Sequence, residues 1–215
     1  YNLQGGHNNV AIGMQALEAE DGHGLNVAIG NEALQTLNAG ANGYNVAVGF
    51  QAGHLMSTGT NNVVIGGATG NALTTGSFNV AIGKAALSTE DAHGKNVAIG
   101  YAALETQNAG ADAFNVAVGF NAGNAMTTGV ENTIIGGSAG DALTIGNYNT
   151  ALGAFSLGLS VDGDYNTAIG YKALQDYEDG DGNGHNTAVG AKSQLNASTG
   201  EFNTSLGSLS IGAAV

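Results

Sequence analysis

The chain has 215 residues, of which 17 are acidic and 4 are Lys or Arg, so its formal net charge at pH 7 is −13. Such an acidic surface repels phosphate backbones and anionic lipid heads, which argues against nucleic-acid partners and membrane-surface binding. The sequence has 37 glycines but no proline and no cysteine, so disulfides cannot stabilise it, and the glycines are expected to serve tight turns between short strands. No apolar run of about eighteen residues is present, and we expect neither membrane insertion nor a signal peptide.

A five-residue motif, Asn9-Val10-Ala11-Ile12-Gly13 in its first copy, recurs at a short and nearly constant interval along the whole chain. Such a period indicates a repeat architecture, in which each copy forms one coil that must stack on its neighbours to bury its apolar side chains. We therefore predict an all-β fold, a parallel β-solenoid of about twelve 17–20-residue coils, in a single domain covering 1–215. The asparagines that open the coils are Asn9, Asn26, Asn45, Asn62, Asn79, Asn96, Asn115, Asn132, Asn149, Asn166, Asn186 and Asn203.

The coils are grouped in a longer repeat, because 79–148 echoes 9–78 almost position by position. A third and more divergent unit covers 149–215. Four coils therefore make one unit.

Residue alternation within the motif places its second and fourth residues on one face of an extended strand. The fourth residue is always aliphatic, as in Ile12, and the second changes from valine to threonine from Thr133 onward. We therefore predict that these two columns fill the interior of the coil. On the opposite face lie Ala11, Gly13 and their counterparts, and two interpretations of that face stay open: the glycine makes the corner of each coil, or the small residues pack against other copies of the chain.

The second half of five coils carries an Ala-Leu pair, such as Ala16-Leu17. In four coils glycine replaces the leucine, and a large apolar residue stands three places later. Such compensation predicts a filled interior. The glycines are Gly53, Gly70, Gly123 and Gly140, and the compensating residues are Met56, Leu73, Met126 and Leu143.

The repeated asparagine is best explained as a structural ladder, because one asparagine per coil can hydrogen-bond its counterparts in the coils above and below. An aromatic residue precedes this asparagine in six coils, and stacking would bring several of these rings side by side. Such a column is more often structural than a platform for stacking sugars. Its members are Tyr44, Phe78, Phe114, Tyr148, Tyr165 and Phe202.

The longest coil contains Asp179, Asp181 and Asn183 at alternate positions, each followed by glycine. Oxygen ligands with this spacing suit the first half of a calcium loop, but no bidentate glutamate follows at the twelfth position, so an EF-hand is excluded. Calcium and a solvated acidic turn both remain open; Asp162 and Asp164 lie in the preceding turn, one coil away. Calcium is the one cofactor that the sequence suggests.

Two equivalent turns, Glu20-Asp21-Gly22-His23 and Glu90-Asp91-Ala92-His93, place acids beside a histidine. Zinc prefers three or four convergent ligands, so we interpret both as exposed polar turns. No nucleophile elbow, phosphate loop or spaced His-carboxylate set is present, and we expect no enzyme activity.

The tandem Asn-Val-Ala-Ile-Gly motif, seen again at 26–30, 45–49, 79–83 and 96–100, resembles the head repeats of trimeric autotransporter adhesins (YadA-like, haemagglutinin-type) and similar repeats in trimeric phage tail fibres. The resemblance implies a left-handed β-roll, a homotrimer, exposure on a cell surface or virion, and a role in attachment. The coils are longer than in the typical adhesin head, and no neck, heptad stalk or anchor follows Val215.

Three functions follow as hypotheses. The first is a structural and adhesive segment of an extracellular fibre that mediates attachment to a cell-surface receptor or glycan. The second is a bacteriophage tail-fibre segment that binds a receptor. It differs from the first only in that a phage, and not a bacterium, carries the fibre. The third is a solenoid subunit that polymerises end to end into an extracellular filament, because an uncapped solenoid exposes pairing edges.

Overall fold

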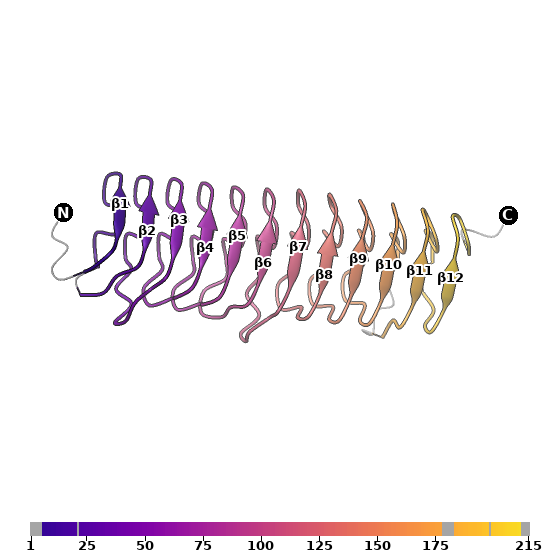
Figure 1. Cartoon of the computed structure of the whole chain (residues 1–215). Coiled ribbons are helices and arrows are strands. Elements are labelled where there is room, and N and C mark those ends of the chain that lie inside the picture. The colour runs from indigo at the N-terminus through magenta and orange to yellow at the C-terminus, as the bar shows by residue number, and fades with distance from the viewer. Residues whose placement is uncertain (1–5, 21, 178–182, 198, 212–215) are drawn as a thin grey trace.

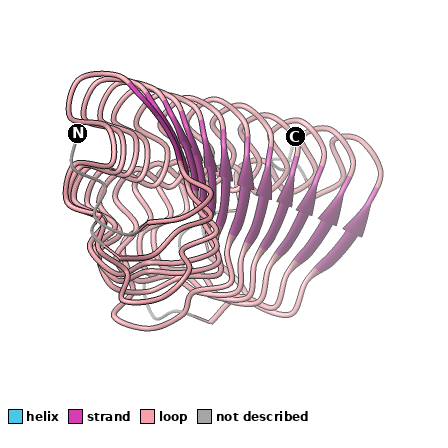
Figure 2. Ribbon diagram, turned by 60° about the vertical axis from the view of Figure 1, so that its left-hand side comes forward, coloured by secondary structure: helices cyan, strands magenta, loops and turns pink. Residues whose placement is uncertain are grey.

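The computed structural model describes residues 6–20, 22–177, 183–197 and 199–211, and within them every regular element is a three-residue β-strand. The strands pair in parallel and in chain order to form one sheet, so the predicted β-solenoid is confirmed (Figures 1 and 2). None of these residues lies in a helix that could cross a membrane. The strands are β1 (Val10–Ile12), β2 (Val27–Ile29), β3 (Val46–Val48), β4 (Val63–Ile65), β5 (Val80–Ile82), β6 (Val97–Ile99), β7 (Val116–Val118), β8 (Thr133–Ile135), β9 (Thr150–Leu152), β10 (Thr167–Ile169), β11 (Thr187–Val189) and β12 (Thr204–Leu206).

Each coil is named below by the strand that it contains, and it begins at the asparagine before that strand. The strands stay in register although the coils differ in length: Val27 pairs with Val46 across one of the longer coils, and Thr167 pairs with Thr187 across the longest. The extra residues therefore lie in the turns, and the columns of like residues run unbroken along the sheet. In Figure 1 the turns that protrude below the strands interrupt an otherwise even row of coils.

The side of the strand that faces the interior is opposite to the one predicted. The middle residue of each strand from β2 to β11, such as Ala28 or Ala81, is fully buried, whereas the flanking valine, threonine, isoleucine and leucine residues are partly or largely exposed. The prediction that Val10 and Ile12 fill the coil is therefore wrong, and so is the proposal that the alanine face packs on other copies. Alternation correctly paired the residues on each face, but hydrophobicity alone chose the wrong face as the interior.

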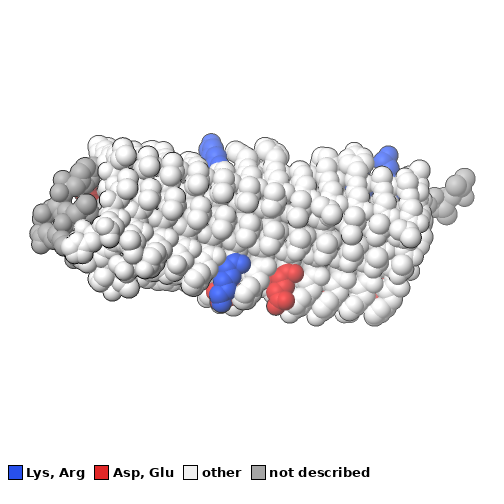
Figure 3. Space-filling model, viewed as in Figure 1, with Lys and Arg blue, Asp and Glu red and all other residues white. Residues whose placement is uncertain are grey.

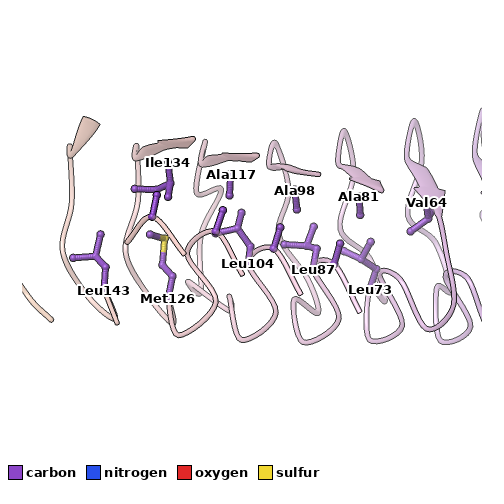
Figure 4. Packing of buried hydrophobic residues seen from close by; sticks show 14 of the residues in the cluster. Val64, Leu73, Ala81, Leu87, Ala98, Leu104, Ala117, Met126, Ile134 and Leu143 are labelled. Atoms are coloured by element: carbon purple, nitrogen blue, oxygen red, sulfur yellow. The ribbon is translucent and has the colours of Figure 1, made fainter. Parts of the chain in front are cut away.

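Limited room inside the coil explains why alanine points inward. Figure 4 shows Ala81, Ala98 and Ala117 pointing from their strands into the coil, where Leu87 and Leu104 from the opposite wall meet them. The leucines already fill that space, so the strand can contribute only a methyl group. Leu17, Leu34, Leu157 and Leu174 occupy the same position in other coils and are also buried.

In two coils the strand contributes the large interior side chain and the facing position is small. In the β4 coil the inward residue is Val64 and the facing position is Gly70, and in the β8 coil the corresponding pair is Ile134 and Gly140. A Cβ at Gly140 would lie 3.2 Å from Cδ1 of Ile134, so the larger strand residue occupies the space of the missing leucine. The predicted compensation by Leu73 and its counterparts is also present, because all four of those large residues are buried.

The glycine that ends each motif forms a corner of the coil. Gly30 has φ +138°, a region that other residues rarely adopt, and a Cβ at this position would overlap the carbonyl group of Gly49 in the next coil. The close neighbour of this glycine is therefore the next coil of the same chain, which agrees with the first of the two interpretations.

Candidate functional site

The outer face of the sheet is the largest distinctive surface of the molecule. We define the outer face as the first and third residues of β1 to β12, all of which are Val, Thr, Ile or Leu. Most of these side chains are half-buried by their neighbours along the column, and at the two ends Ile12 and Leu206 are 59% and 80% exposed. A monomeric chain seldom leaves so long an apolar strip in contact with water, so this face is a candidate interaction surface.

Charged groups lie at the margins of the outer face and not within it. Figure 3 shows the strand-bearing side as uncharged apart from isolated residues along its upper and lower margins. Exposed aromatic side chains border the strip on both sides: Phe50, Tyr101 and Phe120 lie beyond the ends of the strands, and Phe78 and Phe114 lie before their starts. The apolar surface is therefore wider than the two columns alone.

The recurring geometry of the asparagines joins each coil to the next. The backbone N–H of Asn26 donates to Oδ1 of Asn9 at 2.9 Å, and the same bond recurs at every step to the pair Asn203 and Asn186 at 3.0 Å. From Asn26 to Asn186 these side chains are buried. The intermediate steps, from Asn45 to Asn186, have N···O distances of 2.8–3.1 Å.

The amide Nδ2 atoms of the same asparagines close the coil on itself. Asn115, for example, donates to the carbonyl of Gly129 at 2.7 Å and to Oε1 of Gln107 at 3.2 Å. Asn96 and Asn166 are exceptions, because their buried Nδ2 atoms have no hydrogen-bond partner among the described residues, and so is Asn26, whose Nδ2 donates to the carbonyl of Gly24 in the preceding coil. From Asn26 to Asn186 the side chains are buried and inaccessible to a ligand, whereas Asn203 is exposed.

The aromatic column is continuous only in the last third of the chain. Tyr148, Tyr165, His185 and Phe202 form one stack, with ring centroids 4.8, 4.7 and 4.8 Å apart and nearly parallel planes. His185 was not predicted as a member, although it precedes Asn186 and so occupies the aromatic position of its coil. Rings stacked face to face present their edges to solvent, and this arrangement favours a ladder over a sugar platform.

The other three predicted members do not join this stack. The column neighbours of Phe114 are Lys95 and Glu131, and the Lys95 ammonium lies 4.9 Å from the Phe114 ring centroid. Tyr44 and Phe78 are exposed and likewise have non-aromatic residues at the corresponding place in adjacent coils. In the first two units this column therefore carries single rings between non-aromatic residues, and the stacked pair Tyr101 and Phe120 lies outside it.

Two of the three residues of the calcium hypothesis, Asp179 and Asp181, lie outside the described residues. The third, Asn183, is exposed, and its backbone carbonyl accepts a hydrogen bond from the Tyr177 hydroxyl at 2.8 Å. In the preceding coil, Oδ1 of Asp164 accepts a bond from the backbone N–H of Asn147 at 2.6 Å. Asp164 thus already serves coil stacking, and calcium binding at this turn stays a hypothesis.

The two acid-histidine turns differ from the expected exposed polar turns. Glu20 and Glu90 are 1% and 0% exposed, and each lies eleven places after the motif asparagine, the position that Leu37, Met56 and Leu73 occupy in other coils. Burial raises the pKa of Glu90, while the backbone N–H groups of His93 and Ala109 and the His93 imidazole oppose this rise. A carboxylate has thus replaced a core side chain at the same place in two successive units.

No protein-family model, curated protein sequence or solved structure matches this chain.

Proposed function

We propose that this chain is a structural and adhesive segment of an extracellular fibre, in which parallel copies associate through the outer face. The observation that carries the proposal is the uncharged Val/Thr/Ile/Leu surface that runs along all twelve strands of the sheet. Strands that turn alanine inward and valine, isoleucine or leucine outward leave large hydrophobic side chains available to a partner.

A second copy of the same chain is the occupant that suits this surface. All coils have the same register, so a parallel copy keeps its aliphatic columns beside those of its neighbour over the whole length. Twelve strands at about 4.8 Å spacing give a strip about 53 Å long, and the three-residue strands give it a width of about 10 Å. The strands alone therefore offer on the order of 500 Å², and the bordering aromatic side chains are needed to approach the roughly 800 Å² that each partner contributes to a standard interface.

Three copies are expected from the resemblance to trimeric adhesin and tail-fibre repeats. The rod would then be a rigid spacer that presents attachment sites on its turns or on a neighbouring domain. No catalytic role is proposed.

Mass in solution tests the assembly. The chain of 21.2 kDa should elute as a species of three times that mass in light-scattering measurements. Ile82→Lys combined with Ile99→Lys places two charges on the outer face and should yield monomers, whereas Ala111→Lys, on an exposed turn, should leave the trimer intact. A monomer of the unmodified chain at all concentrations would refute the proposal, and a ladder of growing species would favour the end-to-end filament.

Adhesion to cells tests the attachment role and distinguishes a bacterial adhesin from a phage tail fibre. Beads coated with the assembled chain should bind intact animal or plant cells if the fibre is a bacterial adhesin, and bacterial cells if it is a phage tail fibre. Beads that bind neither, while the trimer forms, would restrict the function to that of a spacer.

A further inference from the structure

The turn of the β5 coil contains two buried polar atoms that have no hydrogen-bond partner among the described residues. These are Oε2 of Glu90, whose side chain is fully buried, and Nδ1 of His93, whose side chain is 31% exposed. Leaving such atoms unpaired costs about 1–3 kcal/mol each, and more for a charged group. A bound ion or a water molecule would satisfy them.

The unpaired atoms belong to three potential metal ligands that converge. One ligand atom from each of Glu90, Asp91 and His93 lies within 4.8 Å of the other two. Nδ1 of His93 is 3.8 Å from Oε1 of Glu90, too far for a hydrogen bond, and a cation between the two atoms would satisfy both. Two ligands of a tetrahedral zinc ion are about 3.3 Å apart, so a shift of well under 1 Å would bring this pair to ligand spacing.

The backbone of the turn is fixed before any ion binds. Thr74 of the preceding coil donates to the Asp91 carbonyl from its backbone N–H at 2.6 Å and from its hydroxyl at 2.8 Å. Nδ2 of Asn79 donates to the His93 carbonyl at 3.3 Å, and the backbone N–H of His93 donates to Oε1 of Glu90, also at 3.3 Å. Such anchoring lowers the ordering cost of binding.

The same arrangement recurs at the equivalent turn of the first unit. Oε2 of Glu20 and Nδ1 of His23 are also buried and without a hydrogen-bond partner among the described residues, and the two side chains approach to 4.0 Å. The recurrence shows that the geometry belongs to the repeat unit.

We propose that Glu90, Asp91 and His93 bind one divalent transition-metal ion, with zinc as the representative species. Two carboxylates and one neutral imidazole balance the charge of the ion and remove the cost of a lone buried carboxylate. Asp91 is exposed and His93 is partly exposed, so the ion can enter from solvent and retain bound water. Nitrogen from His93 selects zinc-like ions over calcium and magnesium.

Calorimetric titration of the full chain with zinc chloride, after chelator treatment and in excess magnesium, tests the site. Magnesium occupies dispersed surface carboxylates, so the isotherm reports the nitrogen-containing site. We expect His93→Gln and Glu90→Gln each to weaken one zinc equivalent by at least about 100-fold, more than is usual for loss of an outer-shell partner. His54→Gln is the matched control, since His54 lies 3.7 Å from Glu32, a carboxylate that is 22% exposed, and it should leave that equivalent unchanged.

A combined variant gives a second and stricter comparison. Glu90→Ser, Asp91→Val and His93→Gly together reproduce Ser160, Val161 and Gly163, the residues at this turn in the third unit. The variant should fold, lose one zinc equivalent and lose the visible absorption that cobalt(II) acquires from a histidine ligand. An isotherm that none of these substitutions changes would overturn the proposal. If Glu90→Gln fails to fold, the exposed Asp91→Asn and the His93→Gln variants still decide the outcome.

Discussion

Two leucines of the β9 coil test which side of the strand faces the interior. Leu152 is the last residue of β9 and 44% exposed on the outer face, whereas Leu157 is fully buried in the core. Truncation of Leu157 to alanine should cost about 2–5 kcal/mol, because it removes buried methyl groups and leaves a cavity. The same truncation of Leu152 removes about three carbons that are only partly covered, so at about 0.8 kcal/mol per buried CH₂ it should cost roughly 1 kcal/mol in the isolated chain.

Urea unfolding of both variants, followed over a range of protein concentrations, measures this difference. In dilute monomeric chain, Leu157→Ala should lower the free energy of unfolding several times more than Leu152→Ala. In the assembled fibre, the cost of Leu152→Ala should grow and become dependent on concentration, because a neighbouring chain then covers the side chain. Equal costs in the monomer would refute the assignment of the outer face.

Three further predictions concern the core, the ladder and one acidic residue. Gly70→Leu should cost about 3 kcal/mol because it collides with Val64 and Leu73, and adding Val64→Ala should recover about half of this cost in a urea double-mutant cycle, since the contact with Leu73 remains. Asn115→Ala should lower the free energy of unfolding by about 3 kcal/mol, because it removes hydrogen bonds made by both Oδ1 and Nδ2. Asn96→Ala should cost clearly less, because Nδ2 of Asn96 has no hydrogen-bond partner among the described residues. Thermal unfolding of the two variants measures the difference. Burial raises the pKa of Asp141, so the folded chain binds that proton more tightly than the unfolded chain and loses stability as pH rises from the ordinary carboxyl pKa through the raised one. Asp141→Asn should therefore raise the melting temperature at neutral pH, with the gain vanishing at about pH 3, and an equal gain at both pH values would contradict this cause.

Periodicity was sufficient to predict the solenoid and its strands. The spacing of the motif asparagines located every strand, because each begins one residue after an asparagine, as at Val10 and Thr204. Parallel stacking followed from a repeat too short to close a sheet of its own. Extra residues in the long coils did not disturb the prediction, since turns absorb them.

Two features of the sequence also indicate which face of each strand is buried, although the hydrophobicity of the columns favours the opposite face. Val64 and Ile134, the large middle residues, stand only in coils where glycine replaces the facing leucine, which is what a shared interior requires. The change from valine to threonine at Thr133 adds a hydroxyl that a surface position tolerates and an interior position penalises. Volume matched across the coil is therefore better evidence of the interior than the hydrophobicity of one column.

Burial of Glu20 and Glu90 had a sequence signal of the same kind. Counting eleven places from the motif asparagine puts both in the column of Leu37, Met56 and Leu73, and this register predicts burial whatever the side chain. Convergence of Asp91 and His93 on the Glu90 carboxylate was not predictable, because it depends on the path of the turn.

Leucines fill the coil, but the strands turn their own large aliphatic residues outward, so each chain would gain stability on association. The interior of a coil holds little more than a leucine facing an alanine, and the asparagine ladder joins successive coils. Each hydrogen bond of that ladder contributes only about 1 kcal/mol net to stability. The two outer columns offer up to about 1.5–3 kcal/mol per side chain when fully covered, and in the isolated chain they realise only part of it. The free energy still available to the molecule therefore lies on the outer face, and this is why charges placed there at Ile82 and Ile99 should separate the copies while each coil remains folded.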